Sequence, residues 1–581
     1  MARKINYDNW SKEELIKELR RIKETKYGLV WHRDLPEEKI DILINPDART
    51  PNEMFPNEMA GKPFPILKET KGKEINGNKG KPTNLLIEGD NYHSLAVLNF
   101  THFETIDFIY IDPPYNTGVD DFIYNDKRID KEDPFRHSKW LSFMEKRLKL
   151  AKNLLKPDGV LYISIGNDEL AQLKMLCDEI FGEFNLVEVI SRVAKTASNK
   201  GTQFSPSVDY LLCYTKDLQK LGKFKDIVTD DWLKLFNKED KRGKYREISL
   251  YQAALDVRPN QNYFIVCPDS SKARPPEGKV YRWTEKTFLE NLKGDKVVFK
   301  KAKNSPLLDE KGKKSTWNIY TKTYLSDREE EGKRPRNFLD EFINRRGADL
   351  LSEMGIEFNY SKPVNLIKYL IQISDKSNDI TVLDFFAGSG TTGHAVIELN
   401  NEDGGNRRFI LCTNNEDNNG TGLKIASDIC YPRIKKVIKG YKKSKGEDVK
   451  GLGGNLKYYV CDFVKAEPTD KNKRKLVSES TEMLCIRENA FELVQDEGDF
   501  KIFKNSDPAK NGAGNYLGIV FYEETINDFK KAIKKIKGHF NTYVFSVSDD
   551  PHEKQFADVK SKVTLCAIPE VILKVYREIF K

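Results

Sequence analysis

Two short turns, each directly after an apolar run, constrain the fold of this chain more than any other feature. One turn has the sequence Asp-Pro-Pro-Tyr at 112–115 and follows the apolar run 106–111. The other is the glycine-containing stretch 384–390, which follows the run 380–383. A helix-like pattern comes after each turn, and this order is typical of an α/β sheet with its site at the carboxyl ends of the strands. The second turn suits a nucleoside cofactor, and the first suits an amine held for modification.

Strand-like and helix-like segments alternate in two separate parts of the chain, as a parallel sheet requires. The expected strands are 85–87, 105–111, 160–165, 186–192, 208–214, 380–384 and 408–413, and the expected helices are 93–100, 140–155, 167–181, 364–373 and 392–399. We therefore predict the α/β fold class, with one sheet whose two halves are separated by an insert.

The insert, residues 216–345, differs in character from its surroundings. Basic residues are interleaved with aromatic ones, as in Tyr-Arg-Trp at 281–283 and Phe-Lys-Lys at 299–301. Basic side chains can neutralise phosphates, and aromatic rings can stack on bases. This composition favours a surface that faces a nucleic acid, although a loop-rich domain with solvated charged faces would show the same features.

The other domain boundaries follow from changes in composition. We expect an N-terminal helix and an irregular arm in 1–80, the two halves of the sheet domain in 81–215 and 346–442, and a small α+β domain for dimerisation or partner binding in 443–581. Within these parts, further helices are expected at 11–26, 527–537 and 570–580, and further strands at 516–522 and 542–547.

The chain's length and charge set the scale of what it can do. Its 581 residues suffice for two to four domains with a sizeable core. The formal net charge is +8, from 97 basic and 89 acidic residues. This mild basicity favours a polyanionic partner, but it also fits an ordinary solvated surface.

Cysteine usage argues against metal and disulfide chemistry. None of the eight cysteines forms a Cys-x-x-Cys pair, and only seven histidines are present, so we expect neither a metal site nor a disulfide framework. Reduced thiols fit a cytosol, and we expect a cytoplasmic protein. No apolar run approaches the ~18 residues of a membrane span, and the N-terminus leads into polar sequence, so no membrane association is expected.

The residues of the first turn suit methyl transfer to an exocyclic amine. An aromatic amine is a poor nucleophile because its lone pair is delocalised into the ring. Asp112 and the carbonyl of Pro113 can accept hydrogen bonds from the amine and so free the lone pair. The consecutive prolines, 113 and 114, fix the backbone, and Tyr115 can stack on a flat ring. A rigid turn without chemistry is the alternative interpretation.

The second turn lacks the Lys-Ser/Thr ending of a phosphate-binding P-loop. Gly388 and Gly390 let the backbone approach a ligand closely. Phe385 or Phe386 could flank an adenine or a methionine-like tail. Asp90, after the strand at 85–87, either holds a ligand or caps the following helix.

These motifs resemble those of amino-methyltransferases that use S-adenosylmethionine, of the permuted β group in which the amine-binding motif precedes the cofactor motif. Residues 112–115 match its catalytic motif, and Phe386, Gly388 and Gly390 match its Phe-x-Gly-x-Gly motif. More closely, the chain resembles the modification (Mod) subunit of type III restriction-modification systems. The matching runs are 86–91, 111–118, 362–364, 384–392, 414–416 and 431–433.

The resemblance implies a Rossmann-like methyltransferase sheet, with the insert as a target-recognition domain. It implies methyl transfer to adenine N6 in a short asymmetric site of double-stranded DNA, with the base flipped out of the helix. Members of this family act as dimers and can associate with an ATP-dependent restriction (Res) subunit. The implied catalytic residues are Asp112, Pro113, Pro114 and Tyr115.

The resemblance also implies a binding site for S-adenosylmethionine. Asp90 would lie near the cofactor's adenine, Lys362 and Pro363 at its methionine end, and Thr413 or Glu416 near its ribose. The implied cofactor-binding residues are Asp90, Asn91, Lys362, Pro363, Asp384, Phe385, Phe386, Gly388, Ser389, Gly390, Thr391, Thr413 and Glu416.

Other activities remain open at this stage. Cytosine-N4 methylation is the nearest alternative because its chemistry is like that of adenine-N6 methylation. Asp112 favours adenine, whereas a serine at this position would favour cytosine. A stand-alone methyltransferase, or an inactive DNA-recognition subunit without a nuclease partner, would share most of these features. Protein glutamine methyltransferases use a related motif but lack the permuted order and the large basic insert. Cytosine-C5 methylation is not expected, because no Pro-Cys dipeptide is present to supply a thiolate.

One departure from the resembled family concerns Ser-Val-Asp-Tyr at 207–210, where its members often carry His-Glu/Asp-Tyr. Asp209 and Tyr210 are nevertheless expected to border the base pocket.

Overall fold

A computed structural model gives the fold of the chain. It describes residues 62–77, 81–118, 133–196, 203–254, 258–374, 376–415, 422–465, 469–505, 514–545 and 552–568, together with 123–124, 127–128, 256 and single positions between 11 and 53. The predicted helix at 11–26 lies largely outside these residues, and the helix at 570–580 lies wholly outside them.

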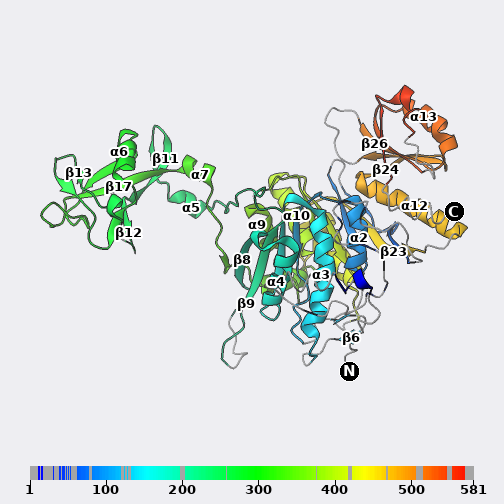
Figure 1. The fold of residues 1–581 in the computed structure, drawn as a ribbon, viewed down its shortest axis with the longest axis horizontal. Coiled ribbons are helices and arrows are strands. Elements are labelled where there is room, and N and C mark those ends of the chain that lie inside the picture. Colours follow the sequence, from blue (N-terminus) through cyan, green and yellow to red (C-terminus); the bar gives the residue numbers. More distant parts are fainter. Residues whose placement is uncertain are drawn as a thin grey trace. The chain divides into compact units, whose positions relative to one another are not determined.

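A mixed sheet of 11 strands forms the centre of the larger part of the chain (Figure 1). In order across the sheet its strands are β1 (Phe64–Glu69), β23 (Asn455–Val464), β3 (Thr83–Glu88), β20 (Arg408–Thr413), β19 (Thr381–Asp384), β4 (Ile106–Ile111), β7 (Leu155–Ile165), β9 (Val208–Thr215), β8 (Leu186–Val193) and β18 (Phe338–Leu339), with β2 (Ile75–Asn76) beside β23. The strands from β23 to β7 run parallel to one another, which confirms the predicted α/β class.

Two groups of helices pack against this sheet. In the first group, α2 lies beside α3, α3 beside α4 and α12 beside α2 (Figure 1). In the second, α10 contacts both α9 and α11. Their bounds are α2 (Asn91–Thr101), α3 (Arg136–Leu154), α4 (Leu170–Phe181), α12 (Asp470–Arg487), α9 (Val364–Ile373), α10 (Thr391–Asp403) and α11 (Tyr431–Lys439).

Alternation along β20 shows that the two helix groups cover opposite faces. Ile410 and Cys412 belong to the core that contains the buried residues of α2, α3 and α4. Phe409 and Leu411 point the other way, since a Cβ placed on Gly393 of α10 would lie 3.2 and 3.0 Å from their side chains. The sheet is therefore covered by helices on both faces, as in doubly wound folds.

The edge of the sheet corrects one sequence-based expectation. Part of the N-terminal stretch that was predicted to be irregular forms β1, which pairs antiparallel with β23. In turn, β23 lies within the predicted C-terminal domain, yet it pairs in parallel with β3 in the central sheet. Pro65 within β1 is tolerated because an edge strand leaves one side of its backbone unpaired.

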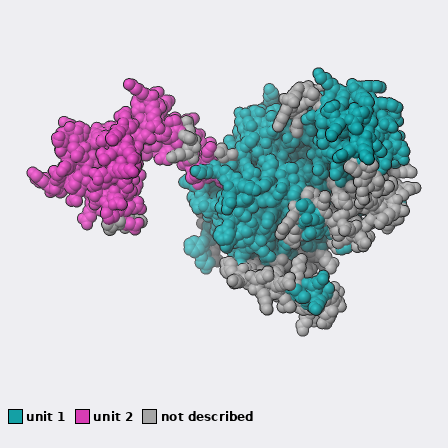
Figure 2. All heavy atoms as spheres, turned by 45° about the horizontal axis from the view of Figure 1, so that its top comes forward, with its two compact units in different colours: residues 1–223, 336–581 teal, residues 224–335 magenta. Residues whose placement is uncertain are grey.

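The insert forms a compact unit of its own, from Phe224 to Pro335 (Figure 2). This unit is shorter than the predicted 216–345 at both ends. Near the end of that range, β18 belongs to the central sheet, and at its start Lys216 and Leu218 hydrogen-bond to Leu155 and Asn185 of the larger part. The insert's four-stranded sheet has the order β10 (Lys238–Asp240), β11 (Gly243–Ser249), β17 (Trp317–Tyr324) and β16 (Val297–Lys301).

The insert has a hydrophobic core of its own, to which Tyr281, Phe288 and Trp317 contribute. Its other elements are helices α5 (Asp230–Lys234), α6 (Glu285–Lys293) and α7 (Leu325–Glu331) and the strand pairs β12 (Tyr251–Ala253) with β15 (Lys279–Tyr281) and β13 (Ile265–Val266) with β14 (Lys272–Ala273). The aromatic residues that suggested a nucleic-acid surface are thus partly used to fold the insert.

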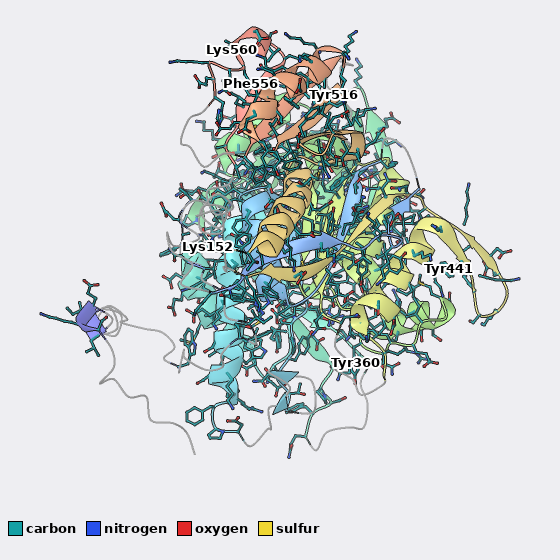
Figure 3. All side chains as sticks on the ribbon, turned by 90° about the vertical axis from the view of Figure 1, so that its right-hand side faces the viewer. Lys152, Tyr360, Tyr441, Tyr516, Phe556 and Lys560 are labelled. Carbon is teal, nitrogen blue, oxygen red and sulfur yellow. The ribbon has the colours of Figure 1, made fainter. Side chains whose placement is uncertain are left out.

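A second, five-stranded sheet follows α12 near the C-terminus. Its order is β24 (Ala490–Asp496), β25 (Phe500–Asn505), β26 (Gly514–Val520), β27 (Gly538–Val544) and β28 (Val563–Cys566), with helix α13 (Ile526–Lys534). Phe556 belongs to its hydrophobic core, and the partly buried Tyr516 packs against that core; both are labelled in Figure 3. The predicted helix at 527–537 and strands at 516–522 and 542–547 correspond to α13, β26 and β27, with shifted ends.

The remaining elements are short. Among the described residues they are β5 (Ile123–Tyr124) with β6 (Lys127–Arg128), β21 (Gly440–Lys442) with β22 (Asp448–Lys450), helix α8 (Arg345–Glu353), and the short helices η3 (Glu183–Asn185), η4 (Pro259–Gln261), η5 (Ile425–Cys430), η6 (Glu523–Thr525) and η7 (Ala557–Val559). All eight cysteines lie among the described residues, and none of them is in a disulfide. Of the helices in the described part of the chain, none is both long and apolar enough to span a bilayer.

Candidate active site

Four neighbouring parallel strands, β3, β20, β19 and β4, end at the same edge of the central sheet. Asp90 follows β3, Thr413 ends β20, Asp384 ends β19 and Asp112 follows β4. Because parallel strands present their carboxyl ends together, the two motifs that the sequence separates meet at one place.

The segment 361–363 joins the two motifs. The Lys362 ammonium donates to both carboxylate oxygens of Asp112, at 2.6 and 2.5 Å. The Lys362 carbonyl accepts a hydrogen bond of 3.5 Å from the Thr391 hydroxyl, and the Ser389 hydroxyl lies 3.1 Å from that of Ser361. Lys362 is buried, whereas the Asp112 side chain keeps 23% of its surface exposed. The carboxylate is therefore both held in place and open to a ligand.

The Asp-Pro-Pro-Tyr turn is held from α3. The indole nitrogen of Trp140 donates to the carbonyl of Pro114 at 2.8 Å. Trp140 is fully buried, so this hydrogen bond forms where water does not compete. Pro113 is buried and Pro114 is half-buried. The backbone of the turn is thus fixed by the proline rings and by a side chain that the sequence analysis did not single out.

Tyr115 lies at the end of this turn with three groups around it. Its hydroxyl donates to Oδ2 of Asp209 at 3.3 Å, and the Lys362 ammonium lies 5.1 Å from its ring centroid. A Cβ on Gly166 would lie 2.8 Å from the ring, so only a glycine leaves room for the ring there. Burial, followed by the charges of Asp112 and Asp209, raises the pKa of Tyr115 well above its ordinary value. The phenol therefore stays protonated at neutral pH.

The Asp384 carboxylate accepts hydrogen bonds from residues of its own turn and of the helix that follows it. One carboxylate oxygen accepts from the backbone amide of Phe386 at 3.0 Å, and the other accepts from the hydroxyl of Thr392 at 2.5 Å. Burial raises the pKa of Asp384 to about 7, and the charge of Asp112 adds to the effect. Asp384 thus closes the turn and titrates near neutral pH.

The glycine turn needs its glycines for different reasons. Gly388 and Gly390 have φ values of 49° and 80°, which lie in the left-handed region. A Cβ on Gly390 would also lie 2.9 Å from the sulfur of Cys430. Phe385 is fully buried in the core, whereas Phe386 is half-buried with its ring 5.9 Å from that of Phe143. Of the two phenylalanines, Phe386 is therefore the one placed to face a ligand.

Arg433 lies beneath this turn and was missed as a site residue. Its guanidinium donates to the hydroxyls of Ser361, Ser389 and Thr391 at 3.1, 2.8 and 2.9 Å. Burial lowers the pKa of Arg433 to about 10, which still leaves it charged. A buried cation under the backbone turn holds the segment 361–363 and the cofactor motif together.

Arg147, on α3, is a second buried arginine that holds site residues, in this case Asp90 and Asn91 after β3. It donates to both Asp90 Oδ1 and Asn91 Oδ1, at 3.0 and 2.5 Å, and the Asn91 amide donates to the carbonyl of Phe385 at 2.8 Å. Burial would raise the pKa of Asp90, but the charge of Arg147 lowers it below its ordinary value. Arg147 lies three residues after Met144 on the inward face of α3, and this charged residue in an apolar stripe is the signal that could have revealed it.

Asp90 also caps α2, since its side chain accepts from the amide of Tyr92 at 2.7 Å. The structure therefore confirms the capping role. The side chain is also 46% exposed at this edge of the sheet, and its role in holding a ligand stays a prediction. Thr413 is buried, and its carbonyl accepts from the amide of Gly89 at 3.0 Å. Pro363 is buried at the start of α9. Glu416 lies outside the described residues.

A further buried cluster supports the end of the catalytic turn. Asn116 has a left-handed φ of 56°, and its amide donates to Glu169 at 2.5 Å. The same oxygen of Glu169 lies 2.6 Å from Nδ1 of His137. Burial raises the pKa of Glu169 above its ordinary value. The strained backbone at Asn116 is stabilised by this hydrogen bond, which fixes how the chain leaves Tyr115.

Similarity to known proteins agrees with this geometry. The family model described as "DNA methylase" (N6_N4_Mtase) matches residues 106–419, more than half of the chain and both motifs. The chain belongs to this family.

Several relatives are named as Mod subunits of type III restriction-modification enzymes. The EcoPI Mod subunit of Escherichia phage P1 is 32% identical over 470 residues, which cover 69% of each chain. The StyLTI Mod subunit of Salmonella typhimurium is 32% identical over 389 residues, covering 61% of this chain and 57% of its own length. The type II methyltransferase M.KpnI of Klebsiella pneumoniae is 33% identical over 372 residues, covering 60% of this chain and 86% of its own. The chain thus spans a little over half to most of the length of these relatives.

Proposed function

We propose that this protein is a site-specific DNA methyltransferase that transfers the methyl group of S-adenosylmethionine to N6 of adenine. The observation that carries the proposal is the ion pair between Lys362 and Asp112, which brings the amine-binding motif and the glycine turn to one edge of the sheet. Family membership and the similarity to Mod subunits support it.

The residues of the glycine turn fit S-adenosylmethionine. Gly388 and Gly390 bring backbone close to a ligand, Phe386 offers a half-buried aromatic face, and the Lys362 ammonium is a partner for the carboxylate of the methionine moiety. Asp90 and Asn91, held by Arg147, would accept hydrogen bonds from the nucleoside. When bound, the cofactor supplies a methyl group on a positively charged sulfur, which makes that carbon electrophilic.

The catalytic turn then activates the amine. Asp112 and the carbonyl of Pro113 accept hydrogen bonds from the two N–H groups of adenine N6, which localises the lone pair on the nitrogen. The nitrogen would gain the methyl group as the bond between that carbon and the sulfur breaks, which would leave S-adenosylhomocysteine. The methylated nitrogen then loses one proton to solvent, and the Asp112 carboxylate stabilises its positive charge until it does so. Tyr115 stacks on the adenine, and this requires the base to leave the DNA helix, because a stacked base cannot reach the site.

The proposal extends to partners and location. The insert would recognise the DNA site, and double-stranded DNA would be the substrate. Because several relatives are named as Mod subunits of type III enzymes, we further propose a homodimer that associates with a Res subunit in the cytoplasm. The described residues contain no group of three or more potential metal ligands, and the proposed reaction uses no metal.

Mass spectrometry of nucleosides tests the proposal directly. Purified protein is incubated with genomic DNA and S-adenosylmethionine carrying a deuterated methyl group, and the DNA is then digested to nucleosides. Labelled N6-methyladenine is the expected product. Labelled N4-methylcytosine would move the assignment to the alternative activity, and unlabelled DNA would contradict methyl transfer.

A further inference from the structure

A buried chain of three side chains ends on the aromatic ring proposed to stack on the target base. Arg192 on β8 and Asp209 on β9 are direct neighbours across the antiparallel pair. The Arg192 guanidinium donates to Oδ2 of Asp209 at 2.9 Å, and the same oxygen accepts the hydroxyl of Tyr115 at 3.3 Å. One carboxylate oxygen therefore accepts hydrogen bonds from both a guanidinium and a phenol.

This chain is shielded from water along its length. The side chains of Arg192 and Asp209 are 1% and 14% exposed. Little solvent can therefore compete with the 2.9 Å charge-assisted hydrogen bond from Arg192, whereas the hydrogen bond from Tyr115 is longer, at 3.3 Å. The phenol of Tyr115 also stays protonated, since its pKa is raised, so it remains a donor to Asp209 at neutral pH.

Arg192 is itself fixed by the segment that follows the insert. Its other terminal nitrogen donates to the carbonyl of Phe342 at 2.6 Å and to Oδ1 of Asn344 at 2.9 Å. In the same stretch β18 pairs in parallel with β8, opposite Ser191 and Arg192. The insert ends at Pro335, so this is the part of the chain that leads from the insert back into the sheet.

We propose that Arg192 and Asp209 are positioning residues that hold the Tyr115 ring in the orientation that receives a flipped adenine. Arg192 fixes Asp209, Asp209 fixes the phenol hydroxyl, and the ring is thereby ordered before the base arrives. Ordering the stacking platform in advance lowers the entropy lost when the base binds. This inference rests on the proposed function, because it concerns how the target base is held.

A double-mutant cycle tests the inference, with the fraction of flipped target base as the measured quantity. The DNA carries 2-aminopurine, whose fluorescence rises when it is unstacked, at the target adenine found by mapping. Tyr115→Phe and Asp209→Ala should each lower the flipped fraction by roughly fivefold, as expected for the loss of one hydrogen bond. The double variant should show no further loss, because both single changes remove the same contact.

Two readouts separate positioning from general damage to the fold. Binding of S-adenosylhomocysteine should stay unchanged in all variants. Asp178→Ala is the matched control, since Asp178 accepts the hydroxyl of Tyr214 at 2.7 Å in an equivalent pair on α4 and β9, and it should leave flipping unchanged. If Asp209→Ala does not fold, Arg192→Lys takes its place, because a lysine cannot hold Asp209 and Asn344 at once.

The outcomes distinguish this inference from the proposed function. If the unmodified protein neither flips 2-aminopurine nor methylates DNA, the proposed function fails. If it does both but the effects of Tyr115→Phe and Asp209→Ala are additive, or Asp209→Ala leaves flipping unchanged, the positioning role is overturned.

Discussion

Asp384 is a buried carboxylate whose ionisation links stability to pH. Its pKa is about 7 in the folded protein, against an ordinary value of 3.8. Below the ordinary pKa both folded and unfolded states are protonated, and the group has no effect. As pH rises toward 7 the unfolded chain loses this proton while the folded site keeps it, so folding becomes less favourable. The penalty is complete above pH 7 and is on the order of 4 kcal/mol, at about 1.4 kcal/mol per pKa unit.

Asp384→Asn should remove this pH-dependent penalty. The difference in free energy of unfolding, variant minus parent, should therefore increase by a few kcal/mol between pH 5 and pH 8. Loss of the carboxylate as a hydrogen-bond acceptor adds an offset that does not change with pH. Urea denaturation at both pH values measures the difference. Thr392→Val is the control, because it removes the hydroxyl that donates to Asp384 but keeps the carboxylate. A difference that stays constant with pH would show that Asp384 ionises normally.

Lys362 is expected to bind the carboxylate of the methyl donor. Lys362→Gln should weaken binding of S-adenosylhomocysteine by about tenfold or more, the effect of losing a charge-assisted hydrogen bond. It should leave 5′-methylthioadenosine, which lacks the amino-acid carboxylate, unaffected. Calorimetric titration of both ligands makes the comparison.

The matched control for Lys362 is Lys376→Gln. It removes another lysine–aspartate pair, in which Lys376 donates to Asp158 at 2.8 Å, and neither ligand should bind less tightly. An equal loss of affinity for both ligands in Lys362→Gln would mean that Lys362 shapes the site without contacting the carboxylate.

At the scale of single elements, helix α10 is bounded by two glycines in the left-handed region. Gly390, before the helix, and Gly404, after it, have φ values of 80° and 72°. Their surroundings differ, because a Cβ would lie 2.9 Å from Cys430 at Gly390 and would meet nothing within 4 Å at Gly404. The two ends of one helix therefore offer a matched pair of substitutions.

Gly404→Ala should destabilise the protein by about 1–2 kcal/mol, the strain of a left-handed alanine. Gly390→Ala should cost more, because it adds a steric clash, and it should also weaken binding of S-adenosylhomocysteine. Chemical denaturation and ligand titration measure the two effects. Adding Cys430→Ala to Gly390→Ala should recover part of the stability. Equal costs at the two positions would argue that the contact with Cys430 relaxes freely.

Local sequence patterns predicted the central strands because each is an apolar run that ends in a distinctive turn. The runs 106–111 and 380–383 are strands followed by special turns, and the structure contains them as β4 and β19. The pairing of β1 with β23 was missed because the two strands lie almost 400 positions apart, and Pro65 reads locally as a break. The partners of Arg147, Arg192 and Arg433 lie in other elements, so the sequence near each arginine could not identify those partners. Only Arg147 carries a local signal, because it is a charged residue in an apolar stripe.

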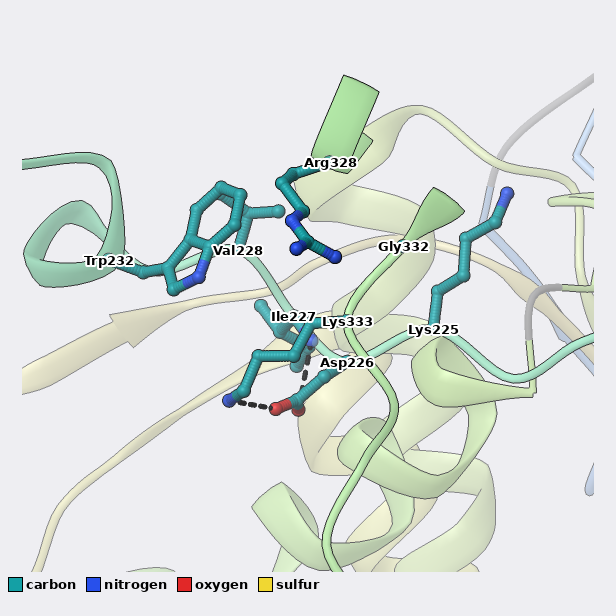
Figure 4. A pocket seen from close by; sticks show the side chains of 8 residues that line it. All are labelled: Lys225, Asp226, Ile227, Val228, Trp232, Arg328, Gly332 and Lys333. Atoms are coloured by element: carbon teal, nitrogen blue, oxygen red, sulfur yellow. Dashed lines mark hydrogen bonds and ion pairs between the residues drawn. The ribbon is translucent and has the colours of Figure 1, made fainter. Parts of the chain in front are cut away.

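At the scale of the whole molecule, the two ends of the insert lie close enough together for the insert to be excised. Its two ends run side by side, since the amide of Asp226 donates to the carbonyl of Lys333 at 2.6 Å and the two side chains form an ion pair (Figure 4). Arg334 also donates to the carbonyl of Phe224 at 2.8 Å. A short Gly-Ser linker can therefore join residue 225 to residue 334 without moving the sheet.

The protein with this replacement should bind S-adenosylhomocysteine as the parent does, because the site lies on the central sheet. It should lose its preference for specific over non-specific DNA, which is at least about a thousandfold in typical site-specific proteins. Competition binding measures that preference. The same linker inserted after Gly312, a position with open space around it, is the control and should leave the preference intact. Unchanged sequence preference after excision would place recognition outside the insert.

We propose that Asp112 receives the amine of a DNA base beside the methyl donor. Single-base mapping of modified DNA, from cells that express either the parent protein or Asp112→Ala, tests this claim most directly. We expect N6-methyladenine at one short sequence with the parent and none with the variant, although the purified variant still binds S-adenosylhomocysteine. Methylation at the same sites by Asp112→Ala would contradict it.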